Sequence, residues 1–199
     1  MVENWKSPDV VLFGPEKVLL VGMTGNEEVR THFETALLRE FFLRGTEAMR
    51  SLDLFDVEFI NSERSEEEIA AVERLLLSRD FDAVLLTKIT GYENQMSPQI
   101  KRREVERKYD RFRDNYGEHQ YLYYQSGPSE ADAGQYMIET AIYCIRTGKT
   151  QQLIWKETVR VTDTKDLERV VEQYISQLLR AMEQQQVIKN LIENENTDL

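Results

Sequence analysis

Residue types that bind metals or form disulfides are scarce in this chain. Its 199 residues include one cysteine, Cys144, and two histidines, His32 and His119. A single thiol excludes an intrachain disulfide, and two histidines exclude a histidine-rich metal site. Cys144 stands in an apolar run, which predicts a small buried hydrophobe and not a reactive thiol. We expect His32 in a helix and His119 in a loop, each bonded or solvated and neither of them catalytic.

Long hydrophobic stretches are also missing. The longest candidates, such as residues 18–23, have the length of a strand, whereas a transmembrane helix needs roughly 18 to 20 apolar residues. Residues 1–9 are polar and lack the basic and apolar regions of a signal peptide. We therefore expect no membrane-spanning segment here, and either a cytosolic protein or one whose targeting segment precedes Met1.

Positive charge is outnumbered, with 25 Lys and Arg against 36 Asp and Glu and a net charge of -11. Binding along nucleic-acid phosphates requires a cationic face, so this balance argues against a nucleic-acid partner. The sequence also contains no P-loop, nucleophile elbow or zinc motif. We therefore predict a chain that is not an enzyme, with no catalytic residues, no cofactor and no metal.

What is present is the pattern of a globular protein, with 41% hydrophobic and 31% charged residues. Apolar runs at 17–23 and 82–89 predict two buried strands, and a further strand is expected within 57–60. Asn26 opens a helix with its stop at Gly45, and the capping box of Ser65 and Glu68 opens another that ends near Ser78. These segments indicate two successive β-α-β passages with right-handed crossovers.

The second half predicts a β-hairpin and a helix. Residues 135–146 and 151–161 are expected to be antiparallel strands joined by a turn at 147–150, with one face of Trp155 packed. Asp163 or Thr164 is expected to cap a final helix whose long apolar stripe includes Val170, Tyr174 and Leu178.

Together these elements predict an α/β (α+β) fold. We expect a mixed β-sheet with two β-α-β passages, a C-terminal β-hairpin and a final helix packed on the sheet. Residues 1–16 are interpreted as a polar lead and 17–188 as a single domain with a long charged, tyrosine-rich insertion at 91–134. Residues 189–199 are interpreted as a frayed tail.

The turn from Gly22 to Asn26 follows a strand and precedes a helix, where a nucleotide-binding loop would lie in a dinucleotide-binding domain. It lacks the third glycine and the spacing of that motif, so a plain turn with a helix cap is favoured. The acidic run Glu66-Glu67-Glu68 is explained as a solvated helix N-terminus.

The insertion contains the most unusual segment, which carries a net charge of +4 between residues 101 and 113 and is followed by several tyrosines. Basic and aromatic side chains together are typical of surfaces that contact partners, anionic glycans or lipid headgroups. A solvated helix stabilised by its own acidic residues is the alternative, and the sequence favours it. The candidate partner surface comprises Arg103, Arg107, Lys108, Arg111, Tyr116, Tyr121 and Tyr123.

The order of several segments resembles that of small bacterial cell-envelope lipoproteins of unknown function. The segments that carry this resemblance are residues 5–9, 17–24, 26–30, 33–34, 82–87, 139–143, 147–149 and 153–155. The overall plan is also similar to penicillin-binding-protein activator lipoproteins and to the N-terminal domain of the Tol translocation protein. The resemblance implies an α/β fold on the periplasmic face of the envelope. It also implies a membrane anchor on a lipidated cysteine that precedes the polar lead, after removal of a signal peptide.

These observations leave three hypotheses for function. The first is a non-catalytic binding or assembly module for another envelope protein or a peptidoglycan-associated component. The second is an enzyme that binds a nucleotide or phosphate at the turn from Gly22 to Asn26. The third is a structural subunit that forms homo-oligomers through the stripe of the final helix.

Overall fold

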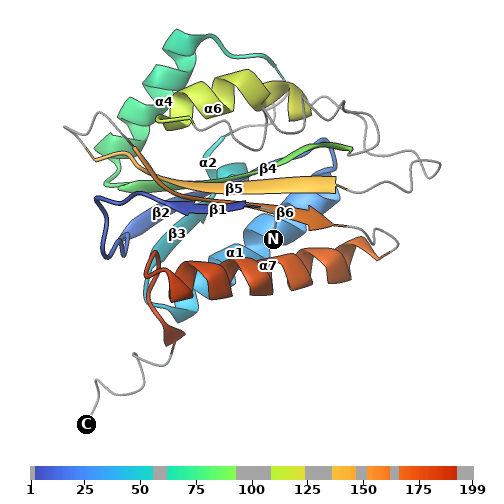
Figure 1. The fold of residues 1–199 in the computed structure, drawn as a ribbon. Coiled ribbons are helices and arrows are strands. Elements are labelled where there is room, and N and C mark those ends of the chain that lie inside the picture. The colour runs from blue at the N-terminus through green and yellow to red at the C-terminus, as the bar shows by residue number, and fades with distance from the viewer. Residues whose placement is uncertain are drawn as a thin grey trace.

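The computed structural model describes residues 3–55, 62–92, 109–123, 136–146, 152–161 and 166–191. A six-stranded mixed sheet with the strand order β1-β6-β5-β4-β2-β3 crosses the molecule. Figure 1 shows α4 and α6 on one face of this sheet and α1 and α7 on the other. The predicted α/β fold is confirmed.

The parallel half of the sheet is built around β2 (Lys17–Met23), which pairs with β3 (Glu47–Arg50) and with β4 (Ala83–Tyr92). Helix α1 (Glu27–Leu43) connects β2 to β3, and α4 (Glu66–Ser78) precedes β4. The chain moves to one side of β2 for β3 and to the other side for β4. Crossovers of one hand therefore place α1 and α4 on opposite faces of the sheet, as Figure 1 shows.

The antiparallel half contains the predicted hairpin, formed by β5 (Tyr136–Cys144) and β6 (Leu153–Val161). Strand β1 (Glu3–Lys6) pairs antiparallel with β6 and forms an edge of the sheet. The polar lead therefore contributes a strand, which its short, polar sequence does not indicate. The expected turn at 147–150 lies outside the described residues.

The helix signals in the sequence agree with the structure at both ends of α1 and both ends of α4. The side chain of Asn26 accepts a hydrogen bond from the Val29 N–H, and Gly45 has φ +66° just after α1. Ser65 and Glu68 form the reciprocal capping box of α4, which ends at Ser78.

The final helix, α7 (Leu167–Gln184), begins later than expected. Its N-cap is Asp166, whose side chain accepts a hydrogen bond from the Arg169 N–H. The expected cap at Asp163 or Thr164 was wrong, because Asp166 offers the same short carboxylate directly before the first helical residue. Tyr174 and Leu178 of the apolar stripe are 4% and 0% exposed. These two residues of the stripe therefore pack in the core.

Several short elements differ from the sequence-based expectation. Strand β3 lies at 47–50, and α2 (Ser51–Leu54) follows it directly. The strand expected within 57–60 lies outside the residues that the structure describes. The insertion at 91–134 contains α6 (Phe112–His119) and the 3₁₀ turn η1 (Gln120–Tyr123), and β4 extends into its start.

Two hydrophobic layers enclose the sheet. One layer joins α1 and α7 to the sheet and contains Leu37, Trp155 and Cys144, each at most 1% exposed. The other joins α4 and α6 to the sheet and contains Leu76 and Phe112. The predictions that Trp155 packs and that Cys144 is a buried small side chain are confirmed.

Candidate functional site: the groove between α4 and α6

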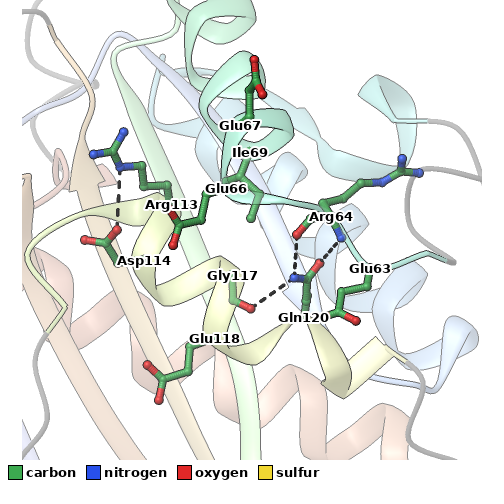
Figure 2. Close-up of a pocket in the computed structure, with 10 residues that line it drawn as sticks. All are labelled: Glu63, Arg64, Glu66, Glu67, Ile69, Arg113, Asp114, Gly117, Glu118 and Gln120. Atoms are coloured by element: carbon green, nitrogen blue, oxygen red, sulfur yellow. Dashed lines mark hydrogen bonds and ion pairs between the residues drawn. The ribbon is translucent and has the colours of Figure 1, made fainter.

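A groove of about 830 Å³ lies between the start of α4 and the outer side of α6. Figure 2 shows that its lining comes from residues just before and within the first turns of α4, from α6 and from the start of η1. The lining residues are Glu63, Arg64, Glu66, Glu67, Ile69, Arg113, Asp114, Gly117, Glu118 and Gln120. Pockets that bind small molecules or chain segments commonly have volumes of roughly 300 to 1,000 Å³, so this groove has room for a side chain or a short peptide.

The wall on the α4 side is held by hydrogen bonds at the start of that helix. Ser65 N–H donates to Glu68 Oε2 at 2.8 Å, and Glu68 N–H donates to Ser65 Oγ at 3.3 Å. Hydrogen bonds from the Ser65 backbone and hydroxyl lower the pKa of Glu68, and the nearby Arg64 lowers it further. These hydrogen bonds favour the ionised form of Glu68 and fix the first turn of α4.

Gln120 joins the two walls of the groove. Its Oε1 accepts from the Arg64 N–H at 2.7 Å, and its Nε2 donates to Arg64 O at 3.0 Å and to Gly117 O at 3.3 Å. Figure 2 shows the Gln120 amide between these backbone groups. Gln120 is only 7% exposed, so these hydrogen bonds are shielded from water. The side-chain amide both accepts and donates, and it thereby fixes the end of α6 against the start of α4.

Gly117 permits the close approach of the two helices. A Cβ placed on this residue would lie 3.3 Å from Cδ1 of Ile69, closer than most side-chain contacts. Ile69 itself is 2% exposed and forms the apolar floor of the groove. A side chain at 117 would require Ile69 to shift by a few tenths of an ångström.

The inner side of α6 rests on a buried set of charged and polar groups. Nζ of Lys88 on β4 lies 3.0 Å from Oε1 of Glu139, whose Oε2 lies 2.7 Å from Nζ of Lys156. All three residues are at most 4% exposed. A buried carboxylate between two ammonium groups on neighbouring strands forms a charge ladder across the sheet, and such buried charges require close pairing.

Asn115 and His119 connect α6 to this ladder. Lys88 Nζ donates to Asn115 Oδ1 at 2.7 Å and lies 3.1 Å from Nε2 of His119, and Asn115 Nδ2 donates to the Tyr143 hydroxyl at 2.7 Å. Burial raises the pKa of the Tyr143 hydroxyl, so it remains protonated and polar at neutral pH. His119 is 3% exposed on a helix, where a loop was expected. These bonds position α6 as the second wall of the groove.

The lining of the groove is predominantly acidic. It includes five carboxylates and two guanidinium groups, which gives a net charge of −3. Arg64 pairs with Glu68 at 3.1 Å and Arg113 with Asp114 at 3.7 Å, so each guanidinium already has a carboxylate beside it. The groove therefore presents a negative potential to a partner.

The turn from Gly22 to Asn26 is arranged differently from a phosphate-binding loop. The Gly22 N–H donates to Glu34 Oε1 at 2.8 Å, and the same oxygen accepts from Ser51 Oγ at 2.7 Å and Arg30 Nε at 3.3 Å. Glu34 is fully buried. A phosphate at this turn would meet the Glu34 carboxylate and an amide that is already bonded, so the geometry favours the plain turn.

The candidate partner surface predicted from the sequence is only partly described. Arg103, Arg107 and Lys108 lie outside the described residues, and Arg111 is the half-buried N-cap of α6.

The tyrosines of that surface are divided between core and solvent. Tyr116 is 6% exposed, and its ring lies 5.7 Å from that of Phe112 and 6.1 Å from that of Tyr123. Tyr123 is half-buried, with the Arg30 guanidinium 4.8 Å from its ring. Tyr121 is 46% exposed and stacks on His119. The structure thus places Tyr116 and Tyr123 together in the layer under α6, and Tyr121 at the surface.

The groove itself could not be recognised in the sequence. The acidic run Glu66-Glu67-Glu68 was interpreted only as a solvated helix N-terminus, and α6 carries few apolar residues in a regular pattern. The signal that could have indicated α6 is the spacing of Phe112, Tyr116 and His119 on one helical face.

The described residues contain neither a metal-binding cluster nor a membrane-spanning helix. Within that part of the chain, no group of three or more His, Cys, Asp or Glu side chains could hold a metal ion. No described helix has the length and hydrophobicity to cross a bilayer.

Comparisons with known proteins give distant structural matches. No protein-family model matches the chain. No curated protein matches it. The lipoprotein GNA1162 from Neisseria meningitidis is 12% identical, over 83% of this chain and 97% of that chain, with a TM-score of 0.42.

Two structures of the PelC dodecamer from Paraburkholderia phytofirmans also match. A variant form is 9% identical, over 90% of this chain and 96% of that one, with a TM-score of 0.46. The other is 11% identical, over 90% and 94%, with a TM-score of 0.44. Matches of this strength identify neither a family nor a function. The resemblance to penicillin-binding-protein activators and to the Tol domain stays a prediction.

Proposed function

We propose that this chain is a non-catalytic binding module of the bacterial cell envelope, and that the α4–α6 groove receives a cationic segment of its partner. The observation that carries the proposal is the combination of room, fixed walls and a net charge of −3 in one groove. A Lys- or Arg-rich segment would place its charges beside carboxylates on walls that are already fixed, so little reorganisation is needed.

Such binding is expected to be weak and sensitive to salt. Ion pairs at a solvated surface each contribute only about 0.2 to 1 kcal/mol. Raising the ionic strength from about 0.1 M to about 1 M shortens the Debye length from about 10 Å to about 3 Å. Binding should therefore be measurable at the lower ionic strength and lost at the higher one.

The direct test is a titration of the full chain with an octalysine peptide, followed by calorimetry and by amide chemical shifts. We expect shifts around the groove with octalysine and none with octaglutamate. The Glu66→Gln/Glu67→Gln variant should bind octalysine several-fold more weakly, because two of the five lining carboxylates lose their charge.

A matched control is available on α1. Glu27 and Glu28 also occupy the first turn of a helix and are exposed, but they do not line the groove. The Glu27→Gln/Glu28→Gln variant makes the same change in net charge and in the helix dipole interaction. If both double variants weakened octalysine binding equally, the groove would not be the binding site.

The envelope location belongs to the same proposal and rests on the segments that carry the lipoprotein resemblance. Its test is the genomic sequence upstream of the codon for Val2. An encoded signal peptide followed by a cysteine at the expected cleavage site would support lipid anchoring. A gene that starts at Met1 with no such segment would remove the envelope from the proposal and leave the groove unaffected.

A further inference from the structure

We propose that the cationic segment received by the groove is residues 101–108 of a second copy of this chain. This inference rests on the proposed binding function of the groove and specifies its partner. It starts from a match of charge within one sequence. Residues 101–108 contain five Lys or Arg and two Glu, a net charge of +3, and the groove lining carries −3.

The rest of the chain strengthens the match. Since the whole chain carries −11 and residues 101–108 carry +3, the remainder carries −14. The segment is therefore a cationic stretch attached to an acidic body. The field of a second copy attracts this segment toward acidic surfaces, among them the groove with its five carboxylates.

The segment leads into α6 through Asp110, which is held against the start of β6. Asp110 O accepts hydrogen bonds from the Gln152 N–H at 2.8 Å and the Leu153 N–H at 3.1 Å, and Leu153 begins β6. The groove opens on the other side of α6, toward α4, which packs against residues of β2 and β4. Arg113 and Asp114, which follow Asp110 by three and four residues, line the groove, and Figure 1 shows α4 and α6 side by side.

A contact between a groove on one copy and a segment on the next is heterologous. Repeated head-to-tail contacts of this kind form a ring if the rotation closes and a filament if it does not. A reciprocal exchange between two copies closes as a dimer, so we expect assemblies of two or more copies at low ionic strength, dissociating to monomers at high ionic strength.

The test uses charge reversal on each side of the contact. The groove variant is Glu66→Lys/Glu67→Lys, and the segment variant is Arg102→Glu/Arg103→Glu. Light scattering and sedimentation equilibrium of the full chain at about 0.1 M and about 1 M ionic strength give the association constant, and circular dichroism checks that each variant folds. Each variant alone should associate at least about tenfold more weakly than the wild type, because like charges now face each other. An equimolar mixture of the two variants should regain association, because each supplies the complement that the other lacks.

The outcomes separate this inference from the function on which it rests. A chain that stays monomeric at low ionic strength and still binds octalysine at the groove overturns the second copy as partner and leaves the binding function standing. If octalysine also fails to bind, both are overturned. If each variant is monomeric but less stable, and the combination of both changes in one chain restores stability, the segment occupies its own groove and the inference is wrong.

Discussion

Glu34 provides the sharpest stability test in the structure. This carboxylate is fully buried, and it accepts hydrogen bonds from the Gly22 N–H, Ser51 Oγ, Arg30 Nε and the Leu52 N–H. Arg30 is 4% exposed and also donates to Ser51 Oγ at 2.9 Å. We therefore expect the Glu34→Gln variant, which has nearly the same shape, to be strongly destabilised.

The size of the effect follows from what the substitution leaves behind. The Arg30 guanidinium loses its buried counter-charge, and an amide NH₂ replaces one of the two oxygens that accept backbone N–H groups. Removing one partner of a buried ion pair typically costs about 3 to 5 kcal/mol. At about 2 to 4 °C per kcal/mol for a chain of this size, the melting temperature should fall by roughly 6 to 20 °C.

Urea unfolding followed by circular dichroism measures the loss, with two companion variants. Arg30→Met/Glu34→Gln removes the unpaired cation as well, so it should be less destabilised than Glu34→Gln alone. Glu47→Gln breaks the exposed pair with Lys17, in which the Glu47 side chain is 63% exposed, and should cost no more than about 1 kcal/mol. A loss below about 1 kcal/mol in Glu34→Gln would refute the view that this buried network stabilises the fold.

Three further substitutions test other parts of the structure. Burial raises the pKa of the Glu157 carboxyl, and Oε2 of Glu157 has no hydrogen-bond partner. The ionised form of Glu157 therefore destabilises the fold, and the free energy of unfolding falls as pH rises above 4.5, the ordinary pKa of a glutamate. Glu157→Gln should therefore stabilise by about 1 kcal/mol near pH 7 and by almost nothing near pH 4, and a gain that is equal at both pH values in urea unfolding would contradict this. Ser65→Ala removes the cap of α4 and should lower the free energy of unfolding by about 1 kcal/mol, whereas no change would mean that the capping box contributes nothing. Gly45→Ala should cost about 1 kcal/mol because φ of Gly45 is +66°, although a Cβ there would meet no atom within 4 Å. Gly45→Asn should cost less, because asparagine tolerates the left-handed region better than alanine. A larger loss in Gly45→Asn than in Gly45→Ala would contradict a backbone origin of the effect.

Much of the fold could be predicted from local signals in the sequence. The N-cap at Asn26, the capping box at Ser65 and the apolar strands at 17–23 and 82–89 each depend on residues close together in the chain, and all appear in the structure. The hairpin of β5 and β6 was visible for the same reason. Helices and strands that have a periodic apolar face can be predicted from their own residues alone.

The elements that were missed depend on distant partners. Strand β1 has four polar or mixed residues and is held by backbone bonds to β6, more than 140 residues away in sequence. Strand β3 is also four residues long and relies on its parallel pairing with β2. Helix α6 buries Asn115 and His119, which a sequence pattern would place in solvent, because Lys88 on β4 satisfies both. No local pattern contains those partners.

The candidate site shares this difficulty. The carboxylates at the start of α4 have a sufficient local explanation, since acidic residues stabilise a helix N-terminus. These carboxylates line a groove only because Gln120 and Gly117 hold α6 against the start of α4. The basic segment at 101–113 was interpreted from the sequence as part of a partner surface, whereas the acidic groove could be recognised only in the folded chain.

The most direct test of the account is paramagnetic broadening of amide signals by an octalysine peptide that carries a nitroxide label. If the α4–α6 groove is the binding site, the Ile69 and Gly117 amides should broaden at about 0.1 M ionic strength and recover at about 1 M. The Gly45 amide, just beyond the end of α1, should stay sharp throughout. Equal broadening at Gly45 and Gly117, or none at either, would contradict a binding groove between α4 and α6.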